Sequence, residues 1–329
     1  MTGWARGVVG VGGAGGYLGL HAILGGLRAD HGWFAVGGLA AWLALGARRA
    51  EVRAVAWFFI PLLIMGAVYD AQRYWADSLR GPIRVREPLA WELAWFGIDT
   101  AEGSVTPAHW WKSRSRPVFD AIAGAGYLLF IPAFLGCAAW WRFKERRLDG
   151  QQVMWALLAL NLAGYATYLI YPAAPPWYVD SYGLGPAKLD ALPDPAGTVR
   201  FDALFGVTWF AEYYSRNANV FGAIPSLHVG QTFLAVLFAL RFRSLRVVTG
   251  SVWLVVTFGS VYFNHHYLVD GLVGMAFAVA AYAVAGAGRP GGRRAGGPEG
   301  RRAGRPGGRR AGGPEGRRAG RPEGRGLKS

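Results

Sequence analysis

The sequence predicts an all-α, polytopic membrane protein, and three observations carry that prediction. The 329 residues are 53% hydrophobic and only 17% charged, whereas a soluble domain has about 25% charged residues. Eight apolar segments approach or reach the roughly 20 residues that a membrane span needs. The basic residues of the short connections all fall on one side of these segments, as the positive-inside rule requires. The single cysteine, Cys137, lies in an apolar run, which excludes a disulfide framework and a cysteine zinc site.

The candidate spans follow one another from near the N-terminus to residue 287. They cover residues 7–27, 33–47, 54–75, 118–141, 151–171, 226–242, 247–263 and 267–287. The first follows Arg6, but no small-residue cleavage site precedes a polar mature start, so we expect an anchor helix rather than a signal peptide. The second is short for a span, and it also fits a re-entrant or interfacial segment. Residues 1–53 are therefore expected to be N-terminal anchor spans, and both a six-span and an eight-span arrangement stay open.

Lys and Arg in the short connections predict the orientation. With eight spans, these residues lie on the same side as the N-terminus and the C-terminal tail, which the positive-inside rule makes cytoplasmic. They are Arg48, Arg49, Arg53, Arg142, Lys144, Arg146, Arg147, Arg241, Arg243 and Arg246. The long connections 76–117 and 172–225 then lie outside, and a six-span arrangement keeps this sidedness. We expect a multi-pass protein of the plasma membrane.

Residues 288–329 form a basic, low-complexity tail. The 16 residues Gly291–Pro306 recur as Gly307–Pro322. The tail contains twelve Arg and one Lys but only three Glu, so the net charge of residues 1–287 is only +5. Gly, Pro and Arg without apolar residues cannot bury a core, so we expect a disordered cytoplasmic tail. Such a tail is attracted to anionic lipid headgroups, and no specific nucleic acid is expected as a partner.

Two polar motifs interrupt the apolar pattern at the predicted outer face. The first is Pro225-Ser226-Leu-His228, at the start of one span, and the second is His266-x-x-x-Asp270, in the tight connection between two spans. Ionisable residues beside membrane spans are costly and mark function by default. Because only one helical hairpin separates the motifs, the chain returns to the same face, and the two histidines are expected to meet there.

The spacing within the motifs suggests how they act. His266 and Asp270 are four residues apart, so on a helix the carboxylate reaches one imidazole nitrogen and orients the ring. Pro225 suits a helix start, where backbone N–H groups favour an anion, and Ser226 adds a hydroxyl donor. On spacing alone, these residues also fit a metal site, a pair of haem ligands or hydrogen-bonded interfacial histidines.

These motifs resemble those of the type-2 phosphatidic acid phosphatase superfamily over roughly residues 54–287. The strings FGAIPSLHVG, YFNHHYLVD and YPAAPPWY are similar to its inositol phosphorylceramide synthase (inositolphosphotransferase) branch. The resemblance implies a six-helix core in a catalytic membrane domain at 54–287, and a metal-independent phosphoryl transfer without a cofactor. It makes His266 the nucleophile that forms a phosphohistidine, Asp270 its orienting partner, and His228 the acid that protonates the leaving alcohol.

Two departures from the superfamily pattern concern phosphate-binding cations. The Lys-x6-Arg-Pro motif of the phosphatases is replaced by the stretch Tyr168 to Pro176, and the Arg six residues before the nucleophile is Ser260. Losing both cations fits a phosphodiester donor, which carries one charge fewer than a monoester. Arg73 and Arg216 are the candidate replacements, and Arg73 is also placed to pair with Asp70 or to reach toward the membrane surface.

The sequence thus predicts an enzyme that moves a phosphoryl headgroup, with inositol phosphate as one candidate, from a phospholipid to a lipid or alcohol acceptor at the extracytoplasmic face. The substrate-binding residues are expected to be Ser226, Arg73 and Arg216, with no metal and no cofactor. One alternative is a lipid phosphate phosphatase, in which water is the acceptor. Another is a non-catalytic membrane adaptor that binds partners through its tail, although the intact histidines and Asp270 argue against it.

Overall fold

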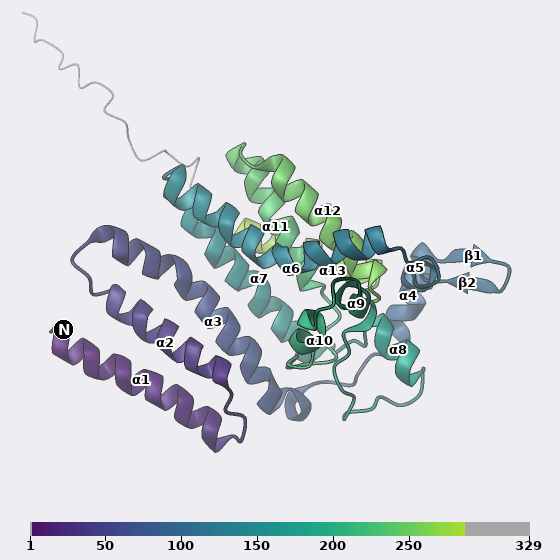
Figure 1. Cartoon of the computed structure of the whole chain (residues 1–329), viewed down its shortest axis with the longest axis horizontal. Coiled ribbons are helices and arrows are strands. Elements are labelled where there is room, and N and C mark those ends of the chain that lie inside the picture. The colour runs from purple at the N-terminus through teal and green to yellow at the C-terminus, as the bar shows by residue number, and fades with distance from the viewer. Residues whose placement is uncertain (1, 287–329) are drawn as a thin grey trace, which may run out of the picture. The chain divides into compact units, whose positions relative to one another are not determined.

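The computed structural model describes residues 2–286, and the repeats expected to form a disordered tail lie outside them. Long helices occupy all eight segments that the apolar pattern singles out (Figure 1). They are α1 (Gly3–Ile23), α2 (Ala29–Ala44), α3 (Ala50–Leu79), α6 (Pro117–Ala139), α7 (Gly150–Ile170), α11 (Leu227–Phe242), α12 (Arg246–Tyr262) and α13 (Leu268–Gly286). The all-α prediction is confirmed.

Four of the helices described in residues 2–286 are long and apolar enough to cross a membrane. They are α3, α6 with the π-helical turn η1 (Trp140–Lys144) that continues it, α7 and α13. Helices α11 and α12 are apolar but shorter. The chain is therefore a multi-pass membrane protein, and the choice between six and eight spans stays a prediction.

Helix α11 lies at the centre of the core and packs against α6, α7, α12 and α13. Its closest approach is to α13, where Gly230 faces Gly274. A Cβ on Gly230 would lie 2.8 Å from the Gly274 carbonyl oxygen, and a Cβ on Gly274 would overlap the Ser226 carbonyl oxygen. Glycine at both positions therefore lets the two backbones touch. Because α11 and α13 carry the two polar motifs at the same end, this contact brings the motifs together.

The N-terminal helices extend this core on one side. Helix α1 packs on α2, α2 on α3, and α3 on α7, so these helices form a row that leads away from the core (Figure 1). Helix α3 is longer than the span expected at 54–75 and runs to Leu79. Asp70 and Arg73 lie within the expected span, just after the apolar run that ends at Tyr69.

The two long connections are folded rather than extended. The first contains α4 (Arg86–Phe96), a hairpin of β1 (Ile98–Thr100) and β2 (Gly103–Val105), and α5 (Pro107–Lys112). The hairpin is antiparallel, with Ile98 opposite Val105. The second contains α8 (Pro176–Tyr182), the 3-10 turn η2 (Ala196–Thr198), α9 (Val199–Phe205) and α10 (Trp209–Tyr214). Figure 1 shows these short elements gathered toward one end of the long helices.

Candidate active site

The first motif forms the start of α11. Ser226 is the N-cap, and its side-chain oxygen accepts a hydrogen bond from the Val229 N–H at 3.5 Å. Leu227 and His228 follow in the first turn and line the large cavity of the protein. The positive end of the α11 dipole thus lies beside that cavity, as expected for a helix start that favours an anion.

The second motif lies in the turn between α12 and α13. Asn264 has a φ of +63°, a left-handed conformation that asparagine tolerates, and the chain reverses there. The Ser260 carbonyl oxygen accepts hydrogen bonds from the backbone N–H groups of His265 and His266, both at 3.0 Å. Asp270 lies in the first turn of α13, and its Oδ2 accepts from the Tyr267 N–H at 2.9 Å. The turn is therefore rigidly held on both sides of His266.

The structure brings His228, His266 and Asp270 together. Nδ1 of His266 lies 3.3 Å from Oδ2 of Asp270, and Nε2 of His266 lies 3.3 Å from Nδ1 of His228. Since a carboxylate accepts hydrogen bonds, Nδ1 of His266 carries the proton, and Nε2 presents its lone pair toward His228. The tautomer is the one that a nucleophile at Nε2 needs.

The electrostatics of this group also suit nucleophilic attack. Burial lowers the pKa of His266 to about 4, so its ring is neutral at neutral pH. Asp270 is fully buried, and its Oδ1 has no hydrogen-bond partner within residues 2–286. A buried carboxylate with spare acceptor capacity stabilises the positive charge that develops on the imidazole as Nε2 forms a bond.

Aromatic side chains hold His228 from the other side. The Tyr127 ring stacks on His228 with a centroid distance of 4.9 Å and an interplanar angle of 17°, and Phe130 lies at 5.2 Å. These contacts fix the ring plane of His228 without occupying its nitrogens. His228 is therefore positioned by packing, whereas His266 is positioned by hydrogen bonds.

His265 is a neighbour of the site that the motif analysis did not single out. Its Nε2 lies 3.0 Å from the Pro195 carbonyl oxygen, which accepts the proton, so its Nδ1 accepts from the Tyr214 hydroxyl at 3.1 Å. Burial lowers the pKa of His265 well below its usual value. Both ring nitrogens are used, so His265 anchors the outer segments against the turn between α12 and α13.

Glu92 of α4 is a second residue that sequence reasoning missed. It is fully buried, and its carboxylate accepts hydrogen bonds from the backbone N–H groups of Leu268 at 3.0 Å and Val269 at 3.1 Å. These N–H groups belong to the first two residues of α13, so Glu92 caps the helix that carries Asp270. Burial raises the pKa of Glu92 to about 7, against the opposing effect of the two donors. No local pattern marks a residue whose partner lies more than 170 positions away.

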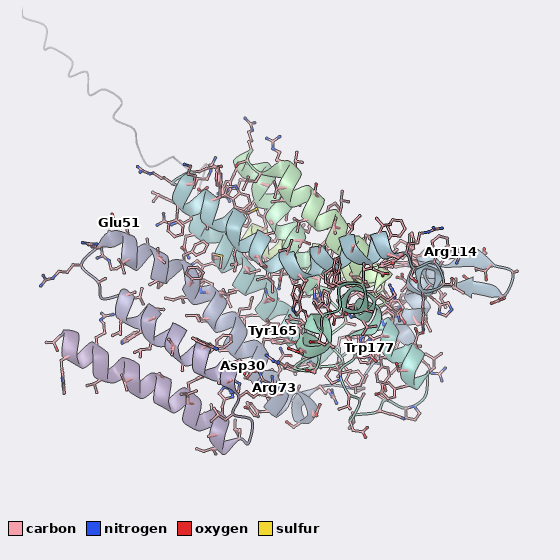
Figure 2. The ribbon with its side chains drawn as sticks, in the orientation of Figure 1. Asp30, Glu51, Arg73, Arg114, Tyr165 and Trp177 are labelled. Carbon is pink, nitrogen blue, oxygen red and sulfur yellow. The ribbon has the colours of Figure 1, made fainter. Side chains whose placement is uncertain are left out.

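A cavity of about 850 Å³ opens beside the two histidines. His228, His265 and His266 lie at one part of its wall, and apolar and aromatic side chains of α2, α3, α6 and α7 form much of the rest. Asp30, Arg73, Tyr165 and Trp177 all line it, and Figure 2 shows that they come from α2, α3, α7 and the short outer helix α8, respectively. A cavity of this size and lining suits a lipid with a polar headgroup.

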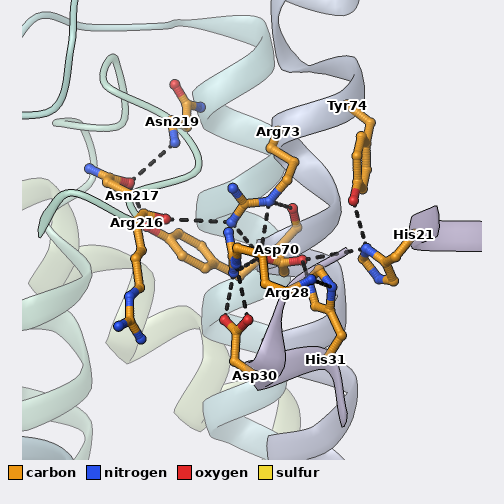
Figure 3. A network of polar contacts seen from close by, with 11 residues as sticks. His21, Arg28, Asp30, His31, Asp70, Arg73, Tyr74, Arg216, Asn217 and Asn219 are labelled. Atoms are coloured by element: carbon orange, nitrogen blue, oxygen red, sulfur yellow. Dashed lines mark hydrogen bonds and ion pairs between the residues drawn. The ribbon is translucent and has the colours of Figure 1, made fainter. Parts of the chain in front are cut away.

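The three expected substrate-binding residues have different surroundings. Arg73 and Arg216 both line the cavity with the histidines. Arg73 is paired with Asp70, whereas the Arg216 guanidinium has no ion pair within residues 2–286 (Figure 3). Ser226 is fully buried beneath the first turn of α11 and is not among the cavity-lining residues. Its observed contact is the helix cap.

The positions of the two missing family cations are occupied by groups that support the site. The Tyr168 hydroxyl donates to the Pro225 carbonyl oxygen at 3.0 Å and so holds the segment before Ser226. Ser260 holds the turn through its carbonyl oxygen, as described above, and its hydroxyl donates to the Thr257 carbonyl oxygen at 2.8 Å. Neither side chain supplies a charge to a phosphate.

A further polar cluster lies beside the same cavity, and four of its residues line it, namely Arg28, Asp30, Asp70 and Arg73. Arg28, Asp30, His31, Asp70 and Arg73 form a continuous set of ion pairs and hydrogen bonds (Figure 3). His21, His31 and Asp70 also offer ligand atoms within 4.8 Å of one another, a spacing that a metal ion could use. The cavity therefore crosses the boundary expected at residue 53 between anchor spans and catalytic domain.

Comparisons with known proteins agree with this geometry. The model of the PAP2 superfamily matches residues 100–284. Phosphoinositol dihydroceramide synthase of Bacteroides thetaiotaomicron is 35% identical over 266 residues, which are 80% of this chain and 86% of the relative. The catalytic subunits of inositol phosphorylceramide synthase of Saccharomyces cerevisiae and Schizosaccharomyces pombe are 30% and 28% identical over 65% and 75% of this chain. The matches cover 52% and 58% of those two yeast relatives. No solved structure matches the chain.

Proposed function

The chain belongs to the PAP2 superfamily, and from this premise we propose that it transfers a phosphoinositol headgroup from a phospholipid to the hydroxyl of a ceramide-type acceptor. The observation that carries the proposal is the His228–His266–Asp270 group at the wall of a lipid-sized cavity. The names of the bacterial and yeast relatives supply the headgroup and the acceptor class. The superfamily and the branch expected from the two motifs are confirmed.

The geometry supports a two-step mechanism. Nε2 of His266 attacks the donor phosphorus, the bond from phosphorus to the diacylglycerol oxygen breaks, and protonated His228 gives its proton to the departing oxygen. His228 then takes a proton from the acceptor hydroxyl, whose oxygen attacks the phosphohistidine and releases His266. Nε2 of His266 faces Nδ1 of His228 at 3.3 Å, so we assign the position of the donor phosphate to the space between the two rings.

Charge stabilisation is assigned to the free cation of the cavity and to the start of α11. We assign the neutralisation of the single charge of a phosphodiester to Arg216, because it lines the cavity and has no ion pair among the described residues. The unpaired N–H groups of the first turn of α11 add to this. Ser226 contributes by capping that turn, and Arg73 contributes to a neighbouring polar cluster.

We further propose that the histidines act at the extracytoplasmic face of the plasma membrane. The short Arg-rich connections lie at the ends of the long helices that are remote from the histidines. Figure 2 shows this for α3, with Glu51 at one end and Arg73 toward the other. By the positive-inside rule, the Glu51 end is cytoplasmic. The basic tail would then lie in the cytoplasm, where anionic headgroups attract it.

Transfer is tested with the full chain reconstituted in liposomes that contain phosphatidylinositol labelled in the inositol ring and a fluorescent ceramide. We expect a product that carries both labels, and a trapped phosphohistidine that His266→Ala lacks. Release of labelled inositol phosphate without any doubly labelled lipid would instead assign hydrolysis. A chain inactive on every phospholipid would contradict the proposed function.

A further inference from the structure

The cavity has a second polar region besides the histidines, and the proposed reaction leaves it without a task. It is formed by Arg28 and Asp30 at the start of α2, by Asp70 and Arg73 at the end of α3, and by Asn217 in the segment after α10. All five side chains line the same cavity as His228 and His266. Figure 3 shows them converging from three separate parts of the chain.

The cluster is pre-organised by its own contacts. Nε of Arg28 donates to Asp30 at 3.0 Å, Nη2 of Arg28 donates to Asp70 at 2.9 Å, and Nε of Arg73 donates to the same Asp70 oxygen at 3.1 Å. His31 is fully buried and accepts from the Arg28 N–H through Nδ1, so its Nε2 donates to Asp70 at 2.7 Å. These contacts hold the side chains of Arg28, Asp30, His31, Asp70 and Arg73 in defined orientations.

The charges of this region disfavour a free anion and a metal ion alike. The guanidinium groups of Arg28 and Arg73 are matched by the carboxylates of Asp30 and Asp70, so the region has no excess of positive charge. Asp70 already accepts from two guanidinium groups and from His31, and Nδ1 of His21 lies 2.6 Å from the Tyr74 hydroxyl. A cation at His21, His31 and Asp70 would lie beside both arginines and displace the His31 proton.

The cluster instead offers alternating hydrogen-bond donors and acceptors at fixed positions, which suits a ligand with adjacent hydroxyl groups. Each hydroxyl donates one hydrogen bond and accepts others, so a carboxylate beside a guanidinium can serve two neighbouring hydroxyls of one ring. The exposed side-chain fractions of Arg28 and Asp30, 29% and 35%, leave atoms available for such bonds. Asn217 adds an amide group, whose oxygen is held by the Tyr69 hydroxyl at 2.6 Å.

We propose that this cluster binds the hydroxyl-rich headgroup of the donor lipid, an inference that rests on the proposed headgroup transfer. The headgroup stays bound to phosphorus through both steps, while one lipid alcohol leaves and another arrives. A fixed polar subsite therefore serves the one component that does not exchange. Arg28 and Asp30 lie outside residues 100–284, which match the superfamily, so this subsite is a specificity element added to the shared catalytic group.

The test compares Asp30→Asn with wild type in the reconstituted full chain. We expect the KM for phosphatidylinositol to rise at least about 10-fold, as for loss of a hydrogen bond to a charged group. The kcat should stay within about threefold, and the KM for the ceramide should not change. Donor lipids that each lack one ring hydroxyl complete a double-mutant cycle. Removing the hydroxyl that Asp30 contacts should raise the KM of wild type but should not raise the KM of Asp30→Asn further.

Asp77→Asn is the matched control, because Asp77 also pairs with an arginine near the end of α3 but does not line the cavity. It should leave both KM values unchanged, and thermal melting of both variants checks folding. If the effects of Asp30→Asn and of each missing hydroxyl on the KM are additive at every ring position, or if only the ceramide KM changes, the proposed subsite is wrong even though wild type still transfers the headgroup. A divalent ion retained by the purified chain and lost in His31→Gln would also overturn it. No transfer by wild type would contradict the proposed function instead.

Discussion

His266 and His228 have distinct surroundings, which agree with the distinct steps that we propose for them. His266 has one nitrogen on Asp270 and the other directed at His228, whereas His228 is held mainly by aromatic packing. A nucleophile is needed whatever the leaving group is. An acid is needed only when the departing oxygen is strongly basic.

We therefore expect His228→Ala to lose about 10²–10⁴-fold with phosphatidylinositol, the usual range for general acid catalysis. A nitrophenyl ester of the same headgroup should restore much of that loss, because nitrophenolate leaves without protonation. His266→Ala should stay inactive on both donors, and Asp270→Asn should fall between the two. Steady-state rates and trapping of an acid-labile, base-stable adduct check this. Equal losses on both donors without an adduct would mean that these residues are structural or bind a metal.

The reaction is expected to need no divalent metal. Nδ1 of His266 is committed to Asp270, and its Nε2 is the attacking atom, so neither nitrogen is available as a lasting ligand. Activity in detergent should stay within about twofold after treatment with excess EDTA. Complete loss that Mg²⁺ or Zn²⁺ restores would contradict this.

Part of the candidate site could be predicted residue by residue. His228, His266 and Asp270 lie in two short motifs that one helical hairpin brings back to the same face, so local spacing was sufficient. The sequence predicts Ser226 as a substrate-binding residue; its hydroxyl oxygen accepts from the Val229 N–H, which is the commoner role of serine before a helix, and its part in substrate binding stays a prediction. The sequence did not single out Arg28 and Asp30 of the proposed headgroup subsite, because they lie beside an apolar segment that has the pattern of an anchor helix.

At the scale of elements, the contact between α11 and α13 aligns the two motifs. Gly274→Ala introduces a Cβ against the Ser226 carbonyl oxygen, so the two helices must separate. Overpacking of this kind costs about 1–3 kcal/mol, and a displacement of about 1 Å at the chemistry can cost about 100-fold. We expect kcat to fall by more than 10-fold with a modest loss of thermal stability.

Gly271→Ala is the matched control for that substitution. It lies on the same helix, but the nearest atom to its added Cβ would be a Val229 methyl group at 3.6 Å, an ordinary contact. It should keep stability and activity close to wild type. Equal damage from both substitutions would show that the spacing of the helices is not what matters.

Glu92 links the outer helix α4 to the start of α13 and makes stability depend on pH. Its pKa is raised from 4.5 to about 7 in the folded protein, so the folded state holds the proton more tightly than the unfolded state. The tighter binding of this proton stabilises the folded state. That contribution is complete below about pH 4.5 and is lost as pH rises through about 7. Between pH 5 and pH 8, Glu92→Gln should therefore lose less stability than wild type, by an amount on the order of 2 kcal/mol.

Denaturant unfolding in detergent at the two pH values measures this difference. Glu87→Gln on the same helix is the control, because Glu87 is half-exposed, pairs with Arg84 and has a lowered pKa. Its effect on the pH dependence should be small and of opposite sign. Identical pH dependence in Glu92→Gln and wild type would contradict the role assigned to Glu92.

The helices differ in how well their own sequence predicts them. The eight long helices could be predicted because each is an apolar run of nearly a span's length. The short helices α4, α5, α8, α9 and α10 could not, because helices of 6 to 11 residues are stabilised by tertiary contacts rather than by their own pattern. Glu92 on Leu268 and Tyr214 on His265 are contacts of that kind.

At the scale of the whole molecule, every residue assigned to the reaction lies between Arg28 and Asp270. The repeats after Gly288 carry none of them. Truncation after Gly288 should therefore keep turnover per folded molecule within a few-fold of the full chain, measured on matched amounts of monodisperse protein. A loss of orders of magnitude would assign the tail a part in catalysis.

The cavity wall has a consequence for inhibitor selectivity. Much of that wall belongs to α2 and α3, which precede residues 100–284, whereas the histidines belong to the part that the superfamily shares. A compound wedged against Trp33, Phe34 and Asp30 would exclude the lipid without touching either histidine. It would spare superfamily enzymes that have the same catalytic motif but other N-terminal helices.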